Sequence, residues 1–175
     1  MSEQLNELAS NIQLLALDVD GVMTDGKLYF SAQGDEIKAF NILDGHGIKM
    51  LLKNGIQVAI ITGRNSPLTA RRARDLGIEH LIQGREDKKF ALLELCDTLD
   101  IDIKQTAYLG DDLPDLGAIV TAGLGMCVAN AHPFVKQHAN FQTTLPGGSG
   151  AVREVCDLLL EARGLLADLH QAYLL

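Results

Sequence analysis

The sequence predicts an α/β fold built around a mostly parallel sheet. Short apolar runs alternate with helix-like segments along the chain, which is typical of this class. One run, Leu14–Leu17, leads directly into Asp18 and Asp20, and four consecutive apolar residues indicate a strand buried on both faces. Open α/β sheets bind ligands at the carboxyl ends of their strands, so this pair of acids indicates a functional site.

Four more strands are expected after that first one. Each is a short apolar run bounded by polar residues or glycine, and together they lie at 57–61, 80–82, 106–109 and 125–128. Because each run is separated from the next by a segment with helical character, we expect the strands to lie parallel in one sheet.

Helices are expected at 44–54, 67–76, 86–99, 132–138 and 151–168. Gly55 and Gly77 are placed to end the first two. Pro67 follows Ser66, which is the order of a first helical residue after its N-cap. The expected buried side chains of the third helix are Phe90, Leu92, Leu93, Leu95 and Leu99. The first eleven residues are consistent with either a short helix or a frayed arm.

A β-hairpin is expected at 26–40, because two apolar-rich segments flank a turn that contains Gly34. The residues expected on its apolar side are Leu28, Phe30, Ile37 and Ala39. A small hairpin cannot cover such a side alone. Two alternatives remain: a partner subunit covers it, or the hairpin folds down on its own domain.

The 175 residues are expected to form one domain, 1–175, with the hairpin as an insertion and a glycine-rich loop and helix at 143–175. The net charge of −8 argues against nucleic acid or an anionic membrane as partner. The three cysteines form no CxxC pair and the start resembles no secretory signal, so we expect a cytoplasmic protein.

Polar groups follow three of the expected strands. Asp18 and Asp20 follow the first, Thr62 the second, and Asp111 with Asp112 the fourth. Neighbouring carboxylates raise one another's pKa unless a cation holds them ionised. Carboxylate oxygens at this density suit a hard cation, and the sequence therefore predicts a Mg²⁺ site.

The same residues suit phosphoryl transfer. A carboxylate can attack phosphorus and form an aspartyl phosphate, and Asp18 leads the pair. Asp20 is placed to act as general acid and then as general base. Thr62 can donate to a phosphoryl oxygen, and Lys88 or Lys89 at a helix start can neutralise the transferring group.

These stretches resemble the four ordered motifs of the haloacid-dehalogenase superfamily of phosphatases. The motifs are Asp18-Val19-Asp20-Gly21, Thr62-Gly63-Arg64, Asp87-Lys88 and Gly110-Asp111-Asp112-Leu113-Pro114-Asp115. The resemblance covers nearly the whole chain. It implies a Rossmann-like three-layer α/β sandwich of the type without a cap domain, since the small hairpin is the only insertion.

Three further stretches, at 17–26, 40–47 and 147–154, resemble the family of phosphatases that act on 3-deoxy-D-manno-octulosonate 8-phosphate on the route to lipopolysaccharide. This resemblance implies catalytic roles for Asp18, Asp20, Thr62 and Lys88. It implies Mg²⁺ held by Asp18, Asp111 and the backbone carbonyl of Asp20. The implied substrate-binding residues are Asp20, Asn41, Ile42, Leu43, Asp44, Gly45, Lys49, Arg64, Arg72 and Lys88.

The resemblance also implies a homotetramer whose hairpins meet at its centre. Three other hypotheses stay open at this point. A phosphatase for another sugar acid, such as a sialic-acid-type 9-phosphate, has the same motifs. A phospho-accepting receiver domain also carries acids, a Thr and a Lys at strand ends, although Asp20 beside Asp18 favours rapid hydrolysis. A non-catalytic oligomerisation module has no physical need for clustered carboxylates.

Overall fold

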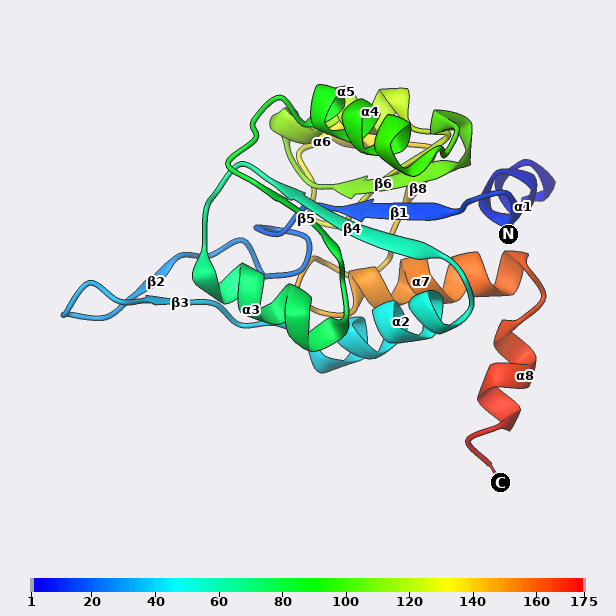
Figure 1. Cartoon of the computed structure of the whole chain (residues 1–175), viewed down its shortest axis with the longest axis horizontal. Helices are drawn as coiled ribbons and strands as arrows, with labels where there is room; N and C mark the ends of the chain where they lie inside the picture. The colour runs from blue at the N-terminus through cyan, green and yellow to red at the C-terminus, as the bar shows by residue number, and fades with distance from the viewer. Residues whose placement is uncertain (1, 175) are drawn as a thin grey trace.

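A six-stranded parallel sheet forms the centre of the computed structural model, which describes residues 2–174 (Figure 1). The strand order is β5-β4-β1-β6-β7-β8. The strands are β1 Leu14–Leu17, β4 Gln57–Thr62, β5 His80–Gln83, β6 Thr106–Gly110, β7 Leu124–Cys127 and β8 Phe141–Gln142. All five strand pairs are parallel, which confirms the predicted fold class. The short strand β8 was not predicted.

Helices cover both faces of this sheet, so the molecule has three layers (Figure 1). One face carries α4 Lys88–Leu99, α5 Leu113–Thr121 and α6 Pro133–Lys136, and the other carries α2 Ile42–Lys53, α3 Pro67–Leu76 and α7 Ala151–Ala162. The remaining helices are α1 Glu3–Ser10, a 3₁₀ turn Ile103–Gln105 and α8 Leu166–Gln171. None of the helices within residues 2–174 is long and apolar enough to cross a membrane.

The sequence prediction did not include α5, and it was wrong in two details of the other helices. Phe90 is 60% exposed instead of buried, because α4 packs on the sheet through Ala91, Leu92 and Leu95 and turns residue 90 away. The single helix expected at 151–168 is two helices. Gly164 adopts the left-handed conformation (φ +71°) and ends α7, after which α8 sets off in a new direction.

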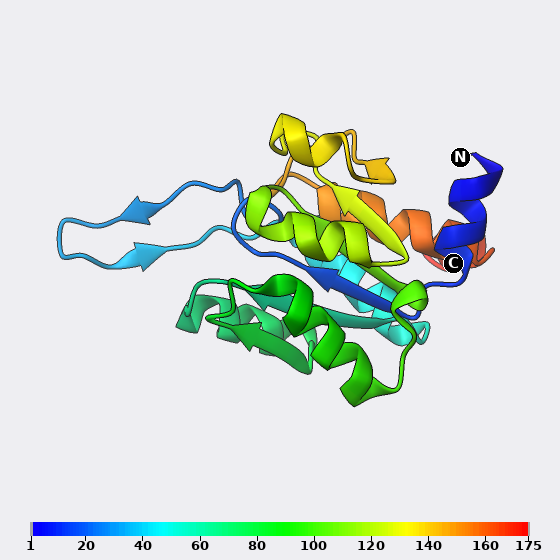
Figure 2. The ribbon, with the colours of Figure 1, turned by 90° about the horizontal axis from the view of Figure 1, so that it is seen from above.

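The hairpin consists of β2 Tyr29–Phe30 and β3 Glu36–Ile37 and projects far from the sheet (Figure 2). It does not fold down on its own domain. Its register pairs Tyr29 with Ile37 and Phe30 with Glu36, so Phe30 and Ile37 lie on opposite faces. The prediction of one apolar side was therefore wrong. Both faces carry exposed apolar side chains, with Phe30 at 62% and Ile37 at 57% exposure.

The glycine-rich segment 147–150 packs against the turn that follows β1. Gly148 donates its backbone N–H to the carbonyl of Val22 at 2.9 Å. A Cβ atom on Gly147 would lie 1.7 Å from the backbone oxygen of Gly21, so only glycine fits there. This segment thereby fixes the backbone next to Asp20.

We predict that Gly147→Ala lowers the free energy of unfolding by about 2 kcal/mol, because the backbone must move to accept the methyl group. The matched control is Gly117→Ala in α5, where the nearest atom is a side-chain carbon 3.3 Å away and alanine favours the helix. Urea unfolding of both variants measures the difference. Equal stabilities of the two variants would contradict this account of the segment.

Candidate active site

The central strands bring their polar ends to one edge of the sheet. β1 lies between β4 and β6, which places Asp18 between Thr62 and Asp111. A cavity of about 500 Å³ opens at this edge. Its lining residues are Asp18, Asp20, Thr62, Gly63, Arg64, Glu86, Lys88 and Pro114. The fold thus gathers the residues for which the sequence predicted catalytic roles.

Three acids at this edge are close enough to hold a metal ion. One carboxylate oxygen from each of Asp18, Asp111 and Asp115 lies within 4.8 Å of the others. Burial and the neighbouring Asp115 carboxylate raise the pKa of Asp18 to about 7, and the same causes raise the pKa of Asp111 to about 8. Such carboxylates require positive charge to stay ionised at neutral pH, and their hard oxygen donors fit Mg²⁺.

Asp115 has a different environment from the other two acids because its oxygens are already occupied. One oxygen accepts from Lys88 Nζ at 2.6 Å and from the Tyr108 hydroxyl at 2.8 Å. The other accepts the backbone N–H groups of Asp111 and Asp112 at 3.0 and 3.3 Å. Asp115 also completes the capping box of α5. It therefore braces the loop that carries Asp111.

Lys88 is the lysine that reaches the site. Its ammonium lies 2.8 Å from Asp18 and 2.6 Å from Asp115, whereas Lys89 is exposed. Burial lowers the pKa of Lys88, but Asp18 and Asp115 outweigh that effect and raise it above the ordinary value. The lysine thus stays charged beside the predicted nucleophile.

Sequence reasoning missed Tyr108, which is fully buried in β6. Its hydroxyl donates to Asp115, and burial together with that carboxylate raises the pKa of Tyr108 well above its ordinary value. The signal was present: a tyrosine inside a buried strand needs a polar partner for its hydroxyl. The partner could not be identified from the pattern alone.

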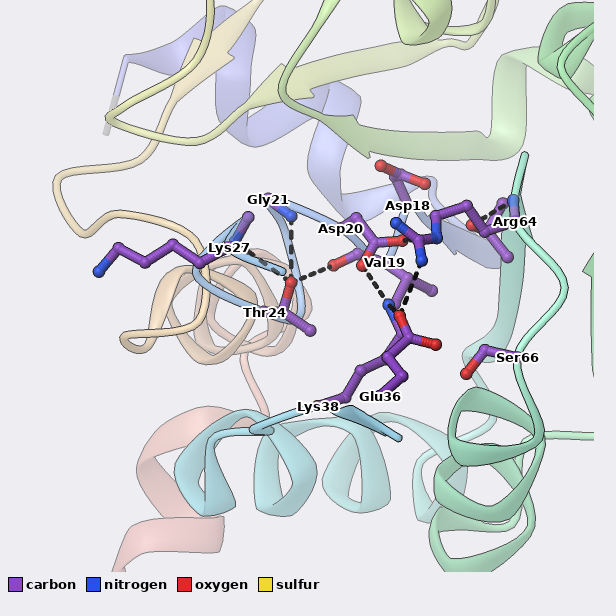
Figure 3. A network of polar contacts seen from close by, with 12 residues as sticks. Asp18, Val19, Asp20, Gly21, Thr24, Lys27, Glu36, Lys38, Arg64 and Ser66 are labelled. Carbon is purple, nitrogen blue, oxygen red and sulfur yellow. Dashed lines mark hydrogen bonds and ion pairs between the residues drawn. The ribbon is translucent and has the colours of Figure 1, made fainter. Parts of the chain in front are cut away.

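Asp20 lies apart from the acid cluster and is held by cations. Lys38 forms an ion pair and hydrogen bond with its Oδ1, and Arg64 Nε lies 3.9 Å from its Oδ2 (Figure 3). Arg64 also donates to Glu36 at 2.8 Å. Sequence reasoning missed Glu36 and Lys38. Their alternation around Ile37 placed both on one side of a hairpin strand, but nothing showed which side met the site.

The other predicted substrate-binding residues form a second group, away from Asp18. They are Asn41, Ile42, Leu43, Asp44, Gly45, Lys49 and Arg72. Arg72 donates to the carbonyl of Asn41 at 3.0 Å. Ile42, Gly45, Lys49 and Arg72 line a smaller cavity of about 220 Å³ with His46 and Leu76. The structure does not bring this group into the cavity of Asp18 within one chain.

Within the second group, the side chains differ in exposure. Ile42 and Leu43 are exposed on the first turn of α2, whereas Asp44 is buried. Asp44 accepts the backbone N–H of Arg153 at 2.8 Å, and burial raises its pKa above the ordinary value. Asp44 therefore joins α2 to the start of α7, and the exposed side chains remain free for other contacts.

Comparison with known proteins identifies close relatives. Residues 78–153 match the haloacid dehalogenase-like hydrolase family model. The 3-deoxy-D-manno-octulosonate 8-phosphate phosphatase KdsC of Yersinia pestis is 49% identical over 166 residues, covering 95% of this chain and 89% of the relative. KdsC of Escherichia coli strain K12 is 50% identical over 160 residues, covering 91% and 85%.

A solved structure from Moraxella catarrhalis superimposes with a TM-score of 0.97 at 43% identity, covering 99% of both chains. That protein is a 3-deoxy-D-manno-octulosonate 8-phosphate phosphatase, in complex with a magnesium ion, a phosphate ion and KDO. The two chains therefore share their fold over nearly their whole length.

We predict that Mg²⁺ stabilises the chain more strongly as the pH rises. The raised pKa values of Asp18 and Asp111 mean that the folded chain binds more protons than the unfolded chain between pH 3.8 and about 8. Without a cation, stability therefore falls as the pH rises through this range. Mg²⁺ offsets the repulsion among the ionised acids, so its effect grows.

Thermal unfolding with and without Mg²⁺ at several pH values between about 5.5 and 8.5 measures this increase. In Asp111→Asn the Mg²⁺-dependent gain in melting temperature is expected to shrink at every pH, because one of the clustered acids is absent. A gain that is constant with pH in the unsubstituted protein would contradict the assignment.

Proposed function

The chain belongs to the haloacid dehalogenase-like hydrolases, in the family of 3-deoxy-D-manno-octulosonate 8-phosphate phosphatases, and we propose that it hydrolyses 3-deoxy-D-manno-octulosonate 8-phosphate. The products are the free sugar acid and inorganic phosphate. The observation that carries this proposal is a sequence identity of 49% to the Yersinia pestis phosphatase over 95% of this chain, together with the Asp18–Lys88 ion pair in the cavity. We place the reaction in the cytoplasm, on the route to lipopolysaccharide.

In the first step, a carboxylate oxygen of Asp18 attacks phosphorus. The bond from phosphorus to the sugar oxygen breaks, and the carboxyl group of Asp20 gives its proton to that oxygen. Lys88, charged and 2.8 Å from Asp18, reduces the repulsion between the nucleophile and the phosphate. Thr62 lies at the end of β4 in the same cavity and donates to a phosphoryl oxygen.

In the second step, Asp20 accepts a proton from water, and the water oxygen attacks the phosphorus of the aspartyl phosphate. The bond between phosphorus and Asp18 breaks, which releases phosphate and restores the carboxylate. Asp18, Asp111 and the backbone carbonyl of Asp20 would hold Mg²⁺, which supplies charge neutralisation when bound.

We also propose that the active protein is a homotetramer in which a neighbouring copy completes the site. The second group of substrate-binding residues lies outside the cavity of Asp18 in its own chain. Exposed apolar side chains on the projecting hairpin, among them Phe30 and Ile37, and on the start of α2 supply contact surface. Lys49 and Arg72 of one copy could then meet the sugar carboxylate bound to another.

The alternative functions have less support. Membership in this family argues against a receiver domain and against a non-catalytic module. Hydrolysis of another sugar-acid phosphate, such as a sialic-acid-type 9-phosphate, requires the same catalytic residues. The choice of substrate therefore depends on the shape and charge of the completed site.

We predict that phosphate release from 3-deoxy-D-manno-octulosonate 8-phosphate exceeds release from a panel of other sugar phosphates, including a nine-carbon sugar-acid 9-phosphate. Asp18→Asn removes the nucleophile and is expected to lower kcat at least about a thousandfold. EDTA is expected to abolish activity, and added Mg²⁺ to restore it. Asp97→Asn, an exposed acid on α4, serves as the control. Equal rates across the panel would overturn the substrate assignment.

We predict that Phe30→Glu lowers the native mass below that of a tetramer, because it places a charge in the proposed contact. Light scattering after size exclusion measures the mass. Val120→Glu is the matched control, since Val120 is 56% exposed on α5, away from the hairpin. A tetramer that persists in Phe30→Glu would show that the hairpins do not hold it together.

A further inference from the structure

Lys38 is a buried cation on an otherwise exposed hairpin. It directly follows β3, and its side chain is only 3% exposed, whereas the preceding Ile37 is 57% exposed. The alternation of side chains along the strand sends Glu36 and Lys38 toward the sheet and Ile37 away from it. A buried ammonium group is unfavourable unless it is paired, so the position indicates a specific partner.

That partner is the carboxylate of Asp20. Lys38 Nζ contacts Oδ1 of Asp20 and lies 3.6 Å from Glu36 (Figure 3). Arg64 approaches the other oxygen of Asp20 at 3.9 Å but gives its hydrogen bond to Glu36. Within residues 2–174, Lys38 is the one side chain that donates a hydrogen bond to Asp20.

The backbone around Asp20 is fixed by other contacts, but these do not fix its side chain. Gly21 adopts φ +97°, and the Thr24 hydroxyl accepts from Gly21 N–H and donates to the Val19 carbonyl. The Asp20 carboxylate itself is 24% exposed and lines the same cavity as Asp18. If this side chain rotated freely, its carboxyl group would often point away from the orientation that proton transfer requires.

We propose that Lys38 is a positioning residue: its ammonium binds Oδ1 of Asp20 and orients the side chain, so that the protonated carboxyl group can pass its proton to the leaving oxygen. This rests on the proposed phosphatase function. It gives the hairpin a second role besides subunit contact: the segment that carries Phe30 outward also sets the direction of the acid and base. Correct placement of the hairpin and efficient proton transfer are thereby linked.

The test compares two leaving groups. Lys38→Met is expected to lower kcat on the sugar-acid phosphate about 10- to 100-fold, with KM nearly unchanged. On p-nitrophenyl phosphate the loss of kcat/KM, which reports only the first step, should be much smaller, because nitrophenolate leaves without a proton. Lys38→Arg should recover part of the lost kcat. The matched control, Lys27→Met, removes a hairpin lysine that is 71% exposed and should leave both rates unchanged.

A double-variant measurement separates positioning from a structural role. If Lys38 acts through Asp20, Lys38→Met should cause little further loss of kcat in an Asp20→Asn background. Light scattering and thermal unfolding of Lys38→Met check that the native mass and the fold are kept. Equal losses of kcat/KM on both leaving groups, additive losses with Asp20→Asn, or a change in KM alone would overturn the proposal.

Failure of the proposed role of Lys38 is distinguishable from failure of the proposed function. If the protein does not prefer the eight-carbon sugar acid, the same comparison is made between p-nitrophenyl phosphate and whichever alkyl phosphate it hydrolyses. The ratio of the two kcat/KM losses then still reports on Asp20 as the acid of the first step. A protein that hydrolyses neither ester would overturn both the proposed function and the role of Lys38.

Discussion

The main constraint on this structure is that the fold places three acids close together, although their negative charges repel one another. Asp18 and Asp111 leave adjacent strands, and Asp115 lies beside them, so one oxygen from each falls within 4.8 Å of the others. Burial makes that repulsion stronger, because little water screens the charges. Positive charge reduces this repulsion. Lys88 lies between Asp18 and Asp115, and the carboxylate oxygens suit Mg²⁺ as a ligand set.

Two braces keep this unfavourable cluster in place. Asp115 joins Tyr108, Lys88 and the backbone N–H groups that follow β6, so it fixes the loop of Asp111 from the interior. The segment around Gly147 packs closely on the turn after β1. The packing at Gly147 leaves no space for an extra atom, and both carboxylate oxygens of Asp115 accept hydrogen bonds. Both features favour a site whose geometry stays fixed while charge moves.

Much of this could be predicted from the sequence, because an apolar run that ends in a polar residue indicates both a strand and a position at its carboxyl end. Asp18, Thr62 and Asp111 are examples, since parallel strands end at the same edge of the sheet. What could not be predicted depends on the direction in which a helix turns its side chains and on the register of paired strands. Phe90 looked buried until the direction of α4 was known, and the hairpin register separated Phe30 from Ile37. Lys38 and Tyr108 needed partners that only the folded chain identifies.

The packing of Gly147 and Gly148 on the turn after β1 has a consequence for how the protein is made. The strand that leads to Asp18, the proposed nucleophile, leaves the ribosome early, yet β6 and Gly147 follow by some ninety and one hundred and thirty residues. A nascent chain that stops before Asp111 contains Asp18 without the acid that lies beside it in the folded protein. On the proposed mechanism, synthesis must therefore pass Asp111 and then Gly147 before the site is complete.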